Sequence, residues 1–130
     1  MTPGGTPGAH CILLVEDDRF LRKAASVMLR KLGHTIVTAE DGEEALRLVQ
    51  SEHPELILLD LIMPKVQGFE VLRRLKGDPA TSSIPIIVMS NLSQETDKQA
   101  MLDAGALEYL VKANLSLTEL AAAVGRAMTK

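Results

Sequence analysis

Residues 56–64 read LILLDLIMP, an apolar run that is interrupted by the carboxylate of Asp60 and closed by Pro64. A continuous apolar run without alternation is typical of a strand that is buried on both faces of a parallel sheet. Asp60 would then stand at the carboxyl end of that strand, where open α/β sheets bind their ligands. Alternatively, Asp60 simply begins a turn, and the other strand ends decide between the two interpretations.

The composition of the chain limits its class. A length of 130 residues predicts one domain, over residues 10–130, and the Gly/Pro-rich residues 1–9 predict a disordered leader. Acidic residues outnumber basic ones by 17 to 14, and Trp is absent, so the chain has little of the basic patch and aromatic platforms expected of nucleic-acid binders. No apolar run approaches the roughly 18 residues of a membrane helix. Without a signal-peptide pattern and with one cysteine, the protein is expected to be cytoplasmic.

Short apolar runs alternate with helical patterns along the chain. The runs lie at residues 11–15, 34–39, 56–60, 86–90 and 109–111, and each is followed by apolar residues at helical spacing. Capping residues predict helix starts at Asp18, Asp41 and Ser116. Five such alternations predict an α/β fold with a parallel sheet and helices on both faces.

Polar residues end four of the predicted strands: Glu16, Asp17 and Asp18 the first, Asp60 the third, Ser90 the fourth and Lys112 the fifth. In a parallel sheet these ends meet at one edge, where crowded carboxylates need a cation, and oxygen ligands suit Mg²⁺. Lys112 and the Ser90 hydroxyl would bind an anion, which completes a phosphoryl-transfer site with an aspartate nucleophile. The alternative is that each residue only caps a helix or ends a strand, and the joint placement argues against it.

Several of these segments resemble a known family. The sequence LVEDD at 14–18, LDLIMP at 59–64 followed by Gly68, Ser90, and YLVK at 109–112 resemble the receiver domain of two-component response regulators, including the chemotaxis regulators. The match extends over about residues 10–129 with order and spacing preserved. The resemblance implies a flavodoxin-like, doubly wound five-stranded sheet with strand order 2-1-3-4-5 and five helices.

The resemblance also implies a role for each matching residue. Asp60 matches the phosphoacceptor, Ser90 the switch hydroxyl, Tyr109 the switch aromatic and Lys112 the phosphate-contacting lysine. Three further residues match the Mg²⁺ ligands: Asp17 directly, Ile62 through its backbone carbonyl, and Glu16 through water. Two positions depart from the family pattern: Ala113 stands where a proline usually follows the lysine, and Asn91 where Ala or Gly usually follows the switch hydroxyl.

The resulting hypothesis is a signalling switch, not an enzyme beyond catalysing its own phosphorylation and dephosphorylation. A sensor histidine kinase or phosphotransfer protein would phosphorylate Asp60 with Mg²⁺ present. A downstream protein would bind the face made by the helix near residues 94–104, strand five and the last helix. Two alternatives stay open, a small Mg²⁺-dependent phosphohydrolase with an aspartyl-phosphate intermediate and a degenerate receiver that only docks partners. The sequence names neither the kinase, the target nor the oligomeric state.

Overall fold

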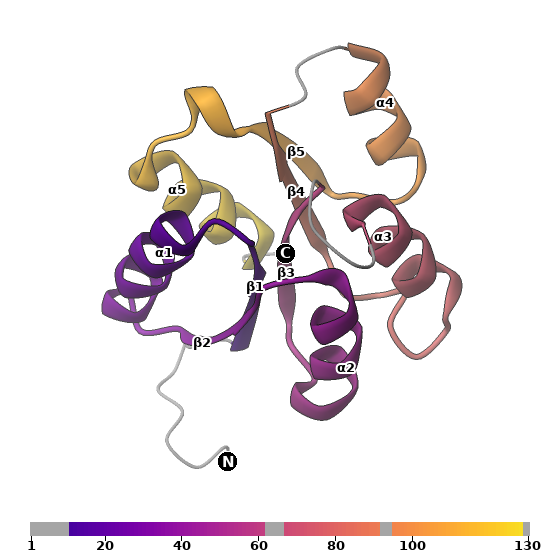
Figure 1. Cartoon of the computed structure of the whole chain (residues 1–130), viewed down its shortest axis with the longest axis horizontal. Coiled ribbons are helices and arrows are strands. Elements are labelled where there is room, and N and C mark those ends of the chain that lie inside the picture. Colours follow the sequence, from indigo (N-terminus) through magenta and orange to yellow (C-terminus); the bar gives the residue numbers. More distant parts are fainter. Residues whose placement is uncertain (1–10, 62–66, 92–94, 129–130) are drawn as a thin grey trace.

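The computed structural model describes residues 11–61, 67–91 and 95–128. Its centre is a five-stranded parallel sheet with strand order β2-β1-β3-β4-β5 (Figure 1). The strands are β1 (Cys11–Val15), β2 (Thr35–Ala39), β3 (Leu56–Asp60), β4 (Ile86–Ser90) and β5 (Glu108–Val111). The helices are α1 (Arg19–Lys31), α2 (Gly42–Glu52), α3 (Gly68–Gly77), α4 (Glu95–Asp103) and α5 (Leu117–Met128), with a 3₁₀ turn, η1 (Lys112–Asn114), after β5. The predicted fold class and strand order are confirmed.

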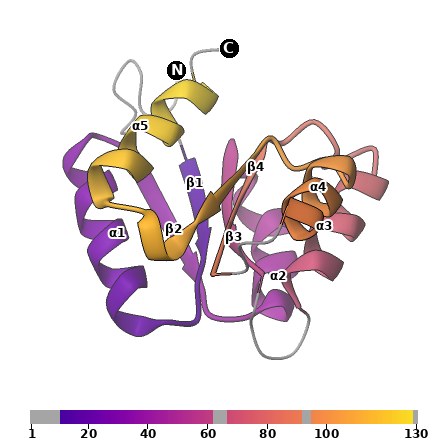
Figure 2. The same ribbon diagram turned by 90° about the horizontal axis from the view of Figure 1, so that it is seen from above.

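Helices cover both faces of the sheet. Figures 1 and 2 show α1 and α5 on one face and α2, α3 and α4 on the other. Alternate residues of β1 divide between the two cores: Leu13 and Val15 pack toward α2 and α3, and Ile12 and Leu14 toward α1 and α5. All five residues of β3 are buried. Burying a Leu or Ile side chain contributes about 1.5–3 kcal/mol, so this double core is the main source of stability.

Side chains cap three helices where the sequence predicts. Asp18 accepts hydrogen bonds from the amides of Phe20 at 2.9 Å and Leu21 at 3.1 Å. Ser116 and Glu119 form a reciprocal capping box at 3.0 and 3.1 Å.

The start of α2 differs in one bond from a capping box. Asp41 accepts from the amide of Glu44 at 2.8 Å, but the Glu44 carboxylate reaches one residue further back than a box requires, to the amide of Glu40 at 2.8 Å.

The register brings the carboxyl ends of four strands to one edge of the sheet. Val15 pairs with Leu59, Asp60 with Met89, and Ser90 with Val111. The residues that follow β1 and β5 therefore lie close to Asp60 and Ser90. The expected leader at residues 1–9 lies outside the described residues. None of the helices in the described ranges has the length and apolar composition needed to cross a membrane.

Candidate functional site

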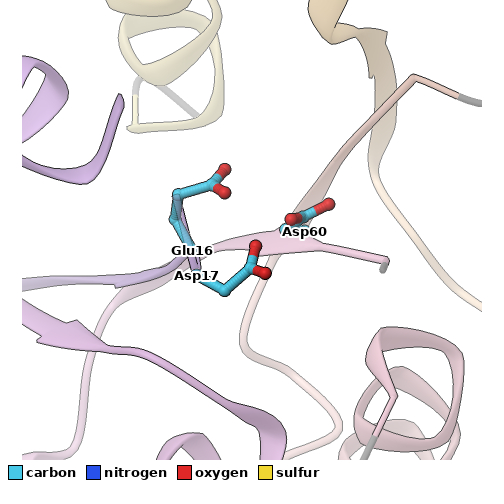
Figure 3. A group of neighbouring side chains, drawn as sticks. All are labelled: Glu16, Asp17 and Asp60. Carbon is cyan, nitrogen blue, oxygen red and sulfur yellow. The ribbon is translucent and has the colours of Figure 1, made fainter. Parts of the chain in front are cut away.

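Three carboxylates meet at the carboxyl edge of the sheet. Glu16 and Asp17 follow β1, and Asp60 ends the neighbouring strand β3. One oxygen of each lies within 4.8 Å of the others, and Figure 3 shows the three side chains around one space. Glu16 is 0% exposed and Asp60 3%, whereas Asp17 is exposed. The acidic group predicted from the strand ends is therefore assembled.

Lys112 joins this group from the end of β5. Its Nζ lies 2.9 Å from Glu16 Oε1, donates to Glu16 Oε2 at 3.1 Å and donates to Asp60 Oδ2 at 3.3 Å. Burial disfavours the charged ammonium, but the hydrogen bonds and charges of Glu16 and Asp60 outweigh burial and raise the pKa of Lys112. Lys112 is therefore held as a cation beside Asp60.

Among the described residues, the two oxygens of the Glu16 carboxylate differ in their hydrogen bonds. Oε2 accepts from the amide of Asp18 at 3.0 Å and from Lys112, but Oε1 is buried and accepts no hydrogen bond from the described residues. The nearby Lys112 ammonium contacts Oε1 as an ion pair without hydrogen-bond alignment. A buried carboxylate oxygen in this state is suited to a cation or to water bound to one. The residues present thus fit a divalent metal site.

Ser90 and Tyr109 lie on the two strands beyond Asp60. Ser90 ends β4, is 0% exposed and pairs with Val111, the residue before Lys112. Tyr109 is 7% exposed and belongs to the core on the α2–α3–α4 face. The structure therefore places Ser90 at the same edge as Asp60 and Lys112, and holds Tyr109 in a buried position.

An open pocket lies beside two of the three carboxylates, Asp17 and Asp60. It is lined by Asp17, Asp60, Asn91 and Lys112, as well as by the residues that begin α1. Among the latter, Phe20 is 87% exposed, and sequence reasoning did not single it out. The available signal was its position, three residues after Asp17 at a helix start, where an aromatic side chain has no core to enter.

Two backbone features fix the site. The Arg22 guanidinium, from α1, donates to the Glu16 carbonyl at 2.8 Å. Gly68, the first residue of α3, lies directly on the main chain of Asp60, because a Cβ at this position would be 2.3 Å from the Asp60 carbonyl oxygen. The sequence pointed to Gly68 only as part of a motif and did not point to Arg22, since neither contact follows a local periodicity.

Two sequence predictions concern the loops around the site. The Ile62 carbonyl lies outside the described residues. At Ala113, where the family pattern has proline, the chain continues from β5 directly into η1.

The family model for the response regulator receiver domain matches residues 12–125. The chain belongs to this family. It is 45% identical over 115 residues to a gliding motility regulatory protein of Myxococcus xanthus, and the match covers 88% of this chain but 15% of that protein. Protein PilH of Pseudomonas aeruginosa is 39% identical over 101 residues, covering 78% of this chain and 84% of PilH. The chain spans 15% to 44% of the length of the first curated relatives it matches.

Solved structures agree with this assignment. The Mn²⁺-bound form of response regulator Rcp1 has a TM-score of 0.78 and 30% sequence identity, and the match covers 89% of this chain and 90% of that chain. Receiver domains are phosphoacceptor switches of two-component systems; they bind a divalent metal at an acidic pocket and interact with histidine kinases and downstream effectors. The acidic group of Glu16, Asp17 and Asp60 fits that site.

Proposed function

We propose that Asp60 is the residue that accepts the phosphoryl group. The observation that carries this proposal is the position of Asp60: it ends a fully buried strand, has Lys112 3.3 Å away, and shares one space with Glu16 and Asp17. In the transfer, a carboxylate oxygen of Asp60 bonds to phosphorus while the bond from phosphorus to the imidazole nitrogen of a phosphohistidine breaks. The imidazole leaves with the electron pair of that bond, and Asp60 becomes an acyl phosphate.

Asp17 and Asp60 would hold the metal directly, and Glu16 through water, with the Ile62 carbonyl added by the family resemblance. We propose Mg²⁺ as the ion, because all of these ligands are oxygens and a small hard cation keeps part of its water shell. When bound, the ion offsets the negative charge of the carboxylates and of the phosphoryl group. The existence of a Mn²⁺-bound form of the similar response regulator Rcp1 supports the proposal of a divalent ion.

Lys112 and Ser90 would bind the phosphoryl oxygens once the group is on Asp60. Lys112 already contacts Asp60, and its raised pKa keeps it charged at neutral pH. Ser90 is buried at the adjacent strand end, and its hydroxyl can donate a charge-assisted hydrogen bond to an anion. Together they would stabilise the phosphorylated state more than the free carboxylate.

The output would be read on the α4–β5–α5 face by a downstream protein, without direct contact to nucleic acid. Among the described residues of α4 only Met101 is buried, so this helix is weakly anchored and easily shifted. Tyr109 is buried in this structure, so a change at this ring would be a repacking within the core. We propose that the change involves Ser90, Tyr109 and α4.

Two other functions are weighed against this one. A phosphohydrolase would need a general acid beside Asp60, but Glu16 is ion-paired with Lys112 and Asp17 faces the metal space. A docking module would not need a lysine held between two buried carboxylates. The hydrolase would release phosphate in repeated turnovers, and the docking module would not take up phosphate.

Incubation with acetyl phosphate and Mg²⁺ tests the proposal. We expect one phosphoryl group per chain, labile to hydroxylamine, and no label on Asp60→Asn, which keeps the size of the side chain but removes the nucleophile. Asp18→Asn is the matched control, because Asp18 caps α1 at the same edge of the sheet and should leave labelling intact. Label on Asp60→Asn at the wild-type level would contradict the assignment. Rapid multiple turnover would favour the hydrolase, and absence of label on the wild type the docking module.

A further inference from the structure

One arginine holds the main chain that carries two of the three carboxylates. Arg22 lies in the first turns of α1, and its Nη1 donates to the carbonyl of Glu16 at 2.8 Å and lies 3.4 Å from the carbonyl of Asp17. These two carbonyls belong to the residues whose carboxylates enter the acidic group. Arg22 therefore contacts their backbone and is not one of the residues that line the pocket beside Asp17 and Asp60.

The Glu16 carbonyl receives its hydrogen bond from Arg22. The ladder of β1 ends at Val15, and beyond it the amide of Glu16 still bonds to the carbonyl of Ala39 at 3.0 Å. Glu16 is 0% exposed, so its carbonyl would lose water on folding, and a buried carbonyl without a donor is unfavourable. Arg22 supplies a charged donor for it, the stronger class of hydrogen bond.

Glu16 is thus fixed at both of its ends. Its carboxylate is bound by the amide of Asp18 and by Lys112, and its carbonyl is bound by Arg22. Asp17 lies between two residues that are each tied to α1, Glu16 through Arg22 and Asp18 through its cap. The main chain on both sides of Asp17 is therefore tied to α1.

We propose that Arg22 is a positioning residue for the divalent cation. It acts by clamping the Glu16–Asp17 main chain in the geometry that brings the carboxylates together, and the inference rests on the proposed metal site. Groups that orient metal ligands typically account for about 10–100-fold in metal affinity.

The charge of Arg22 acts in the opposite direction to its clamping. A guanidinium bound to the main chain of Glu16 and Asp17 lowers the attraction of their carboxylates for a cation, so its removal would tighten metal binding if charge alone mattered. If clamping dominates, removal weakens binding. The sign of the change in affinity therefore separates the two roles.

Arg30 provides a matched control within the same helix. It also donates from α1 to a strand carbonyl, that of Ile36, at 3.2 Å, but Ile36 lies near the amino end of β2. Arg30→Met removes the same charge and the same kind of contact as Arg22→Met, at the other end of the sheet.

The test is a Mn²⁺ titration of the metal-free proteins, with free Mn²⁺ measured by electron paramagnetic resonance. We expect Arg22→Met to weaken Mn²⁺ binding about tenfold, and Arg22→Lys, which keeps the charge but not the planar fork, to weaken it by about threefold. Arg30→Met should stay within about twofold of the wild type, while both Met variants lose a similar amount of melting temperature. Hydrogen exchange without metal should be faster at the Asp18 amide in Arg22→Met only.

Each other outcome overturns the inference. Tighter Mn²⁺ binding by Arg22→Met would show that its charge dominates, and unchanged binding would show a purely structural contact. An equal loss in Arg30→Met would assign the effect to general destabilisation. If Arg22→Met does not fold, unchanged binding by Arg22→Lys suffices to reject the clamp. A wild type that binds no Mn²⁺ would overturn the proposed metal site as well, whereas the phosphorylation of Asp60 is measured separately.

Discussion

Two lysines hold opposite ends of the sheet, and their partners differ. At the amino end of β4, Lys76 Nζ donates to the carbonyls of Ser82 at 3.0 Å and Ile84 at 2.7 Å. At the carboxyl edge, Lys112 Nζ contacts the carboxylates of Glu16 and Asp60. Burial lowers the pKa of Lys76, whereas the two carboxylates raise the pKa of Lys112 despite burial. One lysine therefore holds the loop before β4, and the other offsets the charge of two carboxylates at the carboxyl edge of the sheet.

The two contacts differ in their effect on the free energy of unfolding. At the carboxyl edge, holding the carboxylates of the site together destabilises the fold. Lys76 donates to neutral acceptors, so the contact needs no compensation for repulsion between like charges. Lys112 offsets a repulsion that exists only because three carboxylates are held together. The carboxyl edge should thus respond to cations, and the amino end should not.

The largest effect is expected from removing each lysine in turn. Lys112→Met leaves two buried carboxylates without their cation, which should cost about 3 kcal/mol of unfolding free energy in the absence of metal. Millimolar Mg²⁺ should recover much of this loss. Lys76→Met should cost about 1–2 kcal/mol, independently of Mg²⁺, because only carbonyls lose a donor. Urea unfolding of both variants with and without Mg²⁺ measures this.

If Mg²⁺ restored the unfolding free energy of Lys76→Met, the two ends of the sheet would not differ in their response to cations. The same conclusion would follow from a Lys112→Met variant that Mg²⁺ does not stabilise more than it stabilises the wild type. Acetyl phosphate labelling of Lys76→Met at the wild-type rate serves as the control for an intact site.

Substituting one glycine at each end of the sheet tests the same comparison. We expect smaller effects on stability than for Lys112→Met. Gly68→Ala would force a Cβ against the Asp60 carbonyl, so we expect a loss of about 1–3 kcal/mol together with slower phosphorylation. Gly105, with φ +112°, lies against the Lys76 side chain, where a Cβ would be 2.8 Å from Cγ. Gly105→Ala should lower the melting temperature through backbone strain and leave the phosphorylation rate unchanged. Slower phosphorylation in both variants would mean that the two ends are not separable.

The smallest effect is expected at an exposed ion pair. Hydrogen bonds from Arg73 and Arg74 lower the pKa of Glu70 on α3 to about 2. A lowered pKa in the folded state stabilises above the ordinary pKa of 4.5, and this contribution is lost as pH falls from 4.5 toward about 2. The melting temperatures of wild type and Glu70→Gln should therefore converge across that interval. Since the pair is exposed, the difference at neutral pH should be small, and a large difference would contradict this ordering of buried and exposed charges.

The sequence predicted those parts of the molecule that depend on local pattern. The buried β3 strand, the Asp18 cap and the Ser116–Glu119 box all follow from residue type and spacing, and all are confirmed. The strand order came from the family resemblance, because order depends on packing between distant segments. Phe20 was missed for a related reason, because its pocket also involves residues that end β3 and follow β5, and the contact of Arg22 was missed because it joins α1 to the main chain that follows β1.

The close contact between Gly68 and Asp60 makes the site rigid where β3 meets α3. The part of the site toward α4 is less firmly packed. The first residue of α3 lies against the Asp60 carbonyl and also donates from its amide to Leu61 at 2.9 Å. We therefore expect a new group on the Asp60 side chain to leave the junction of β3 and α3 in place. A displacement is expected instead in the neighbouring strands β4 and β5 and in α4, where Met101 is the one buried residue among those described. Gly68 thus couples the start of α3 to the end of β3, so the two segments should move as one unit.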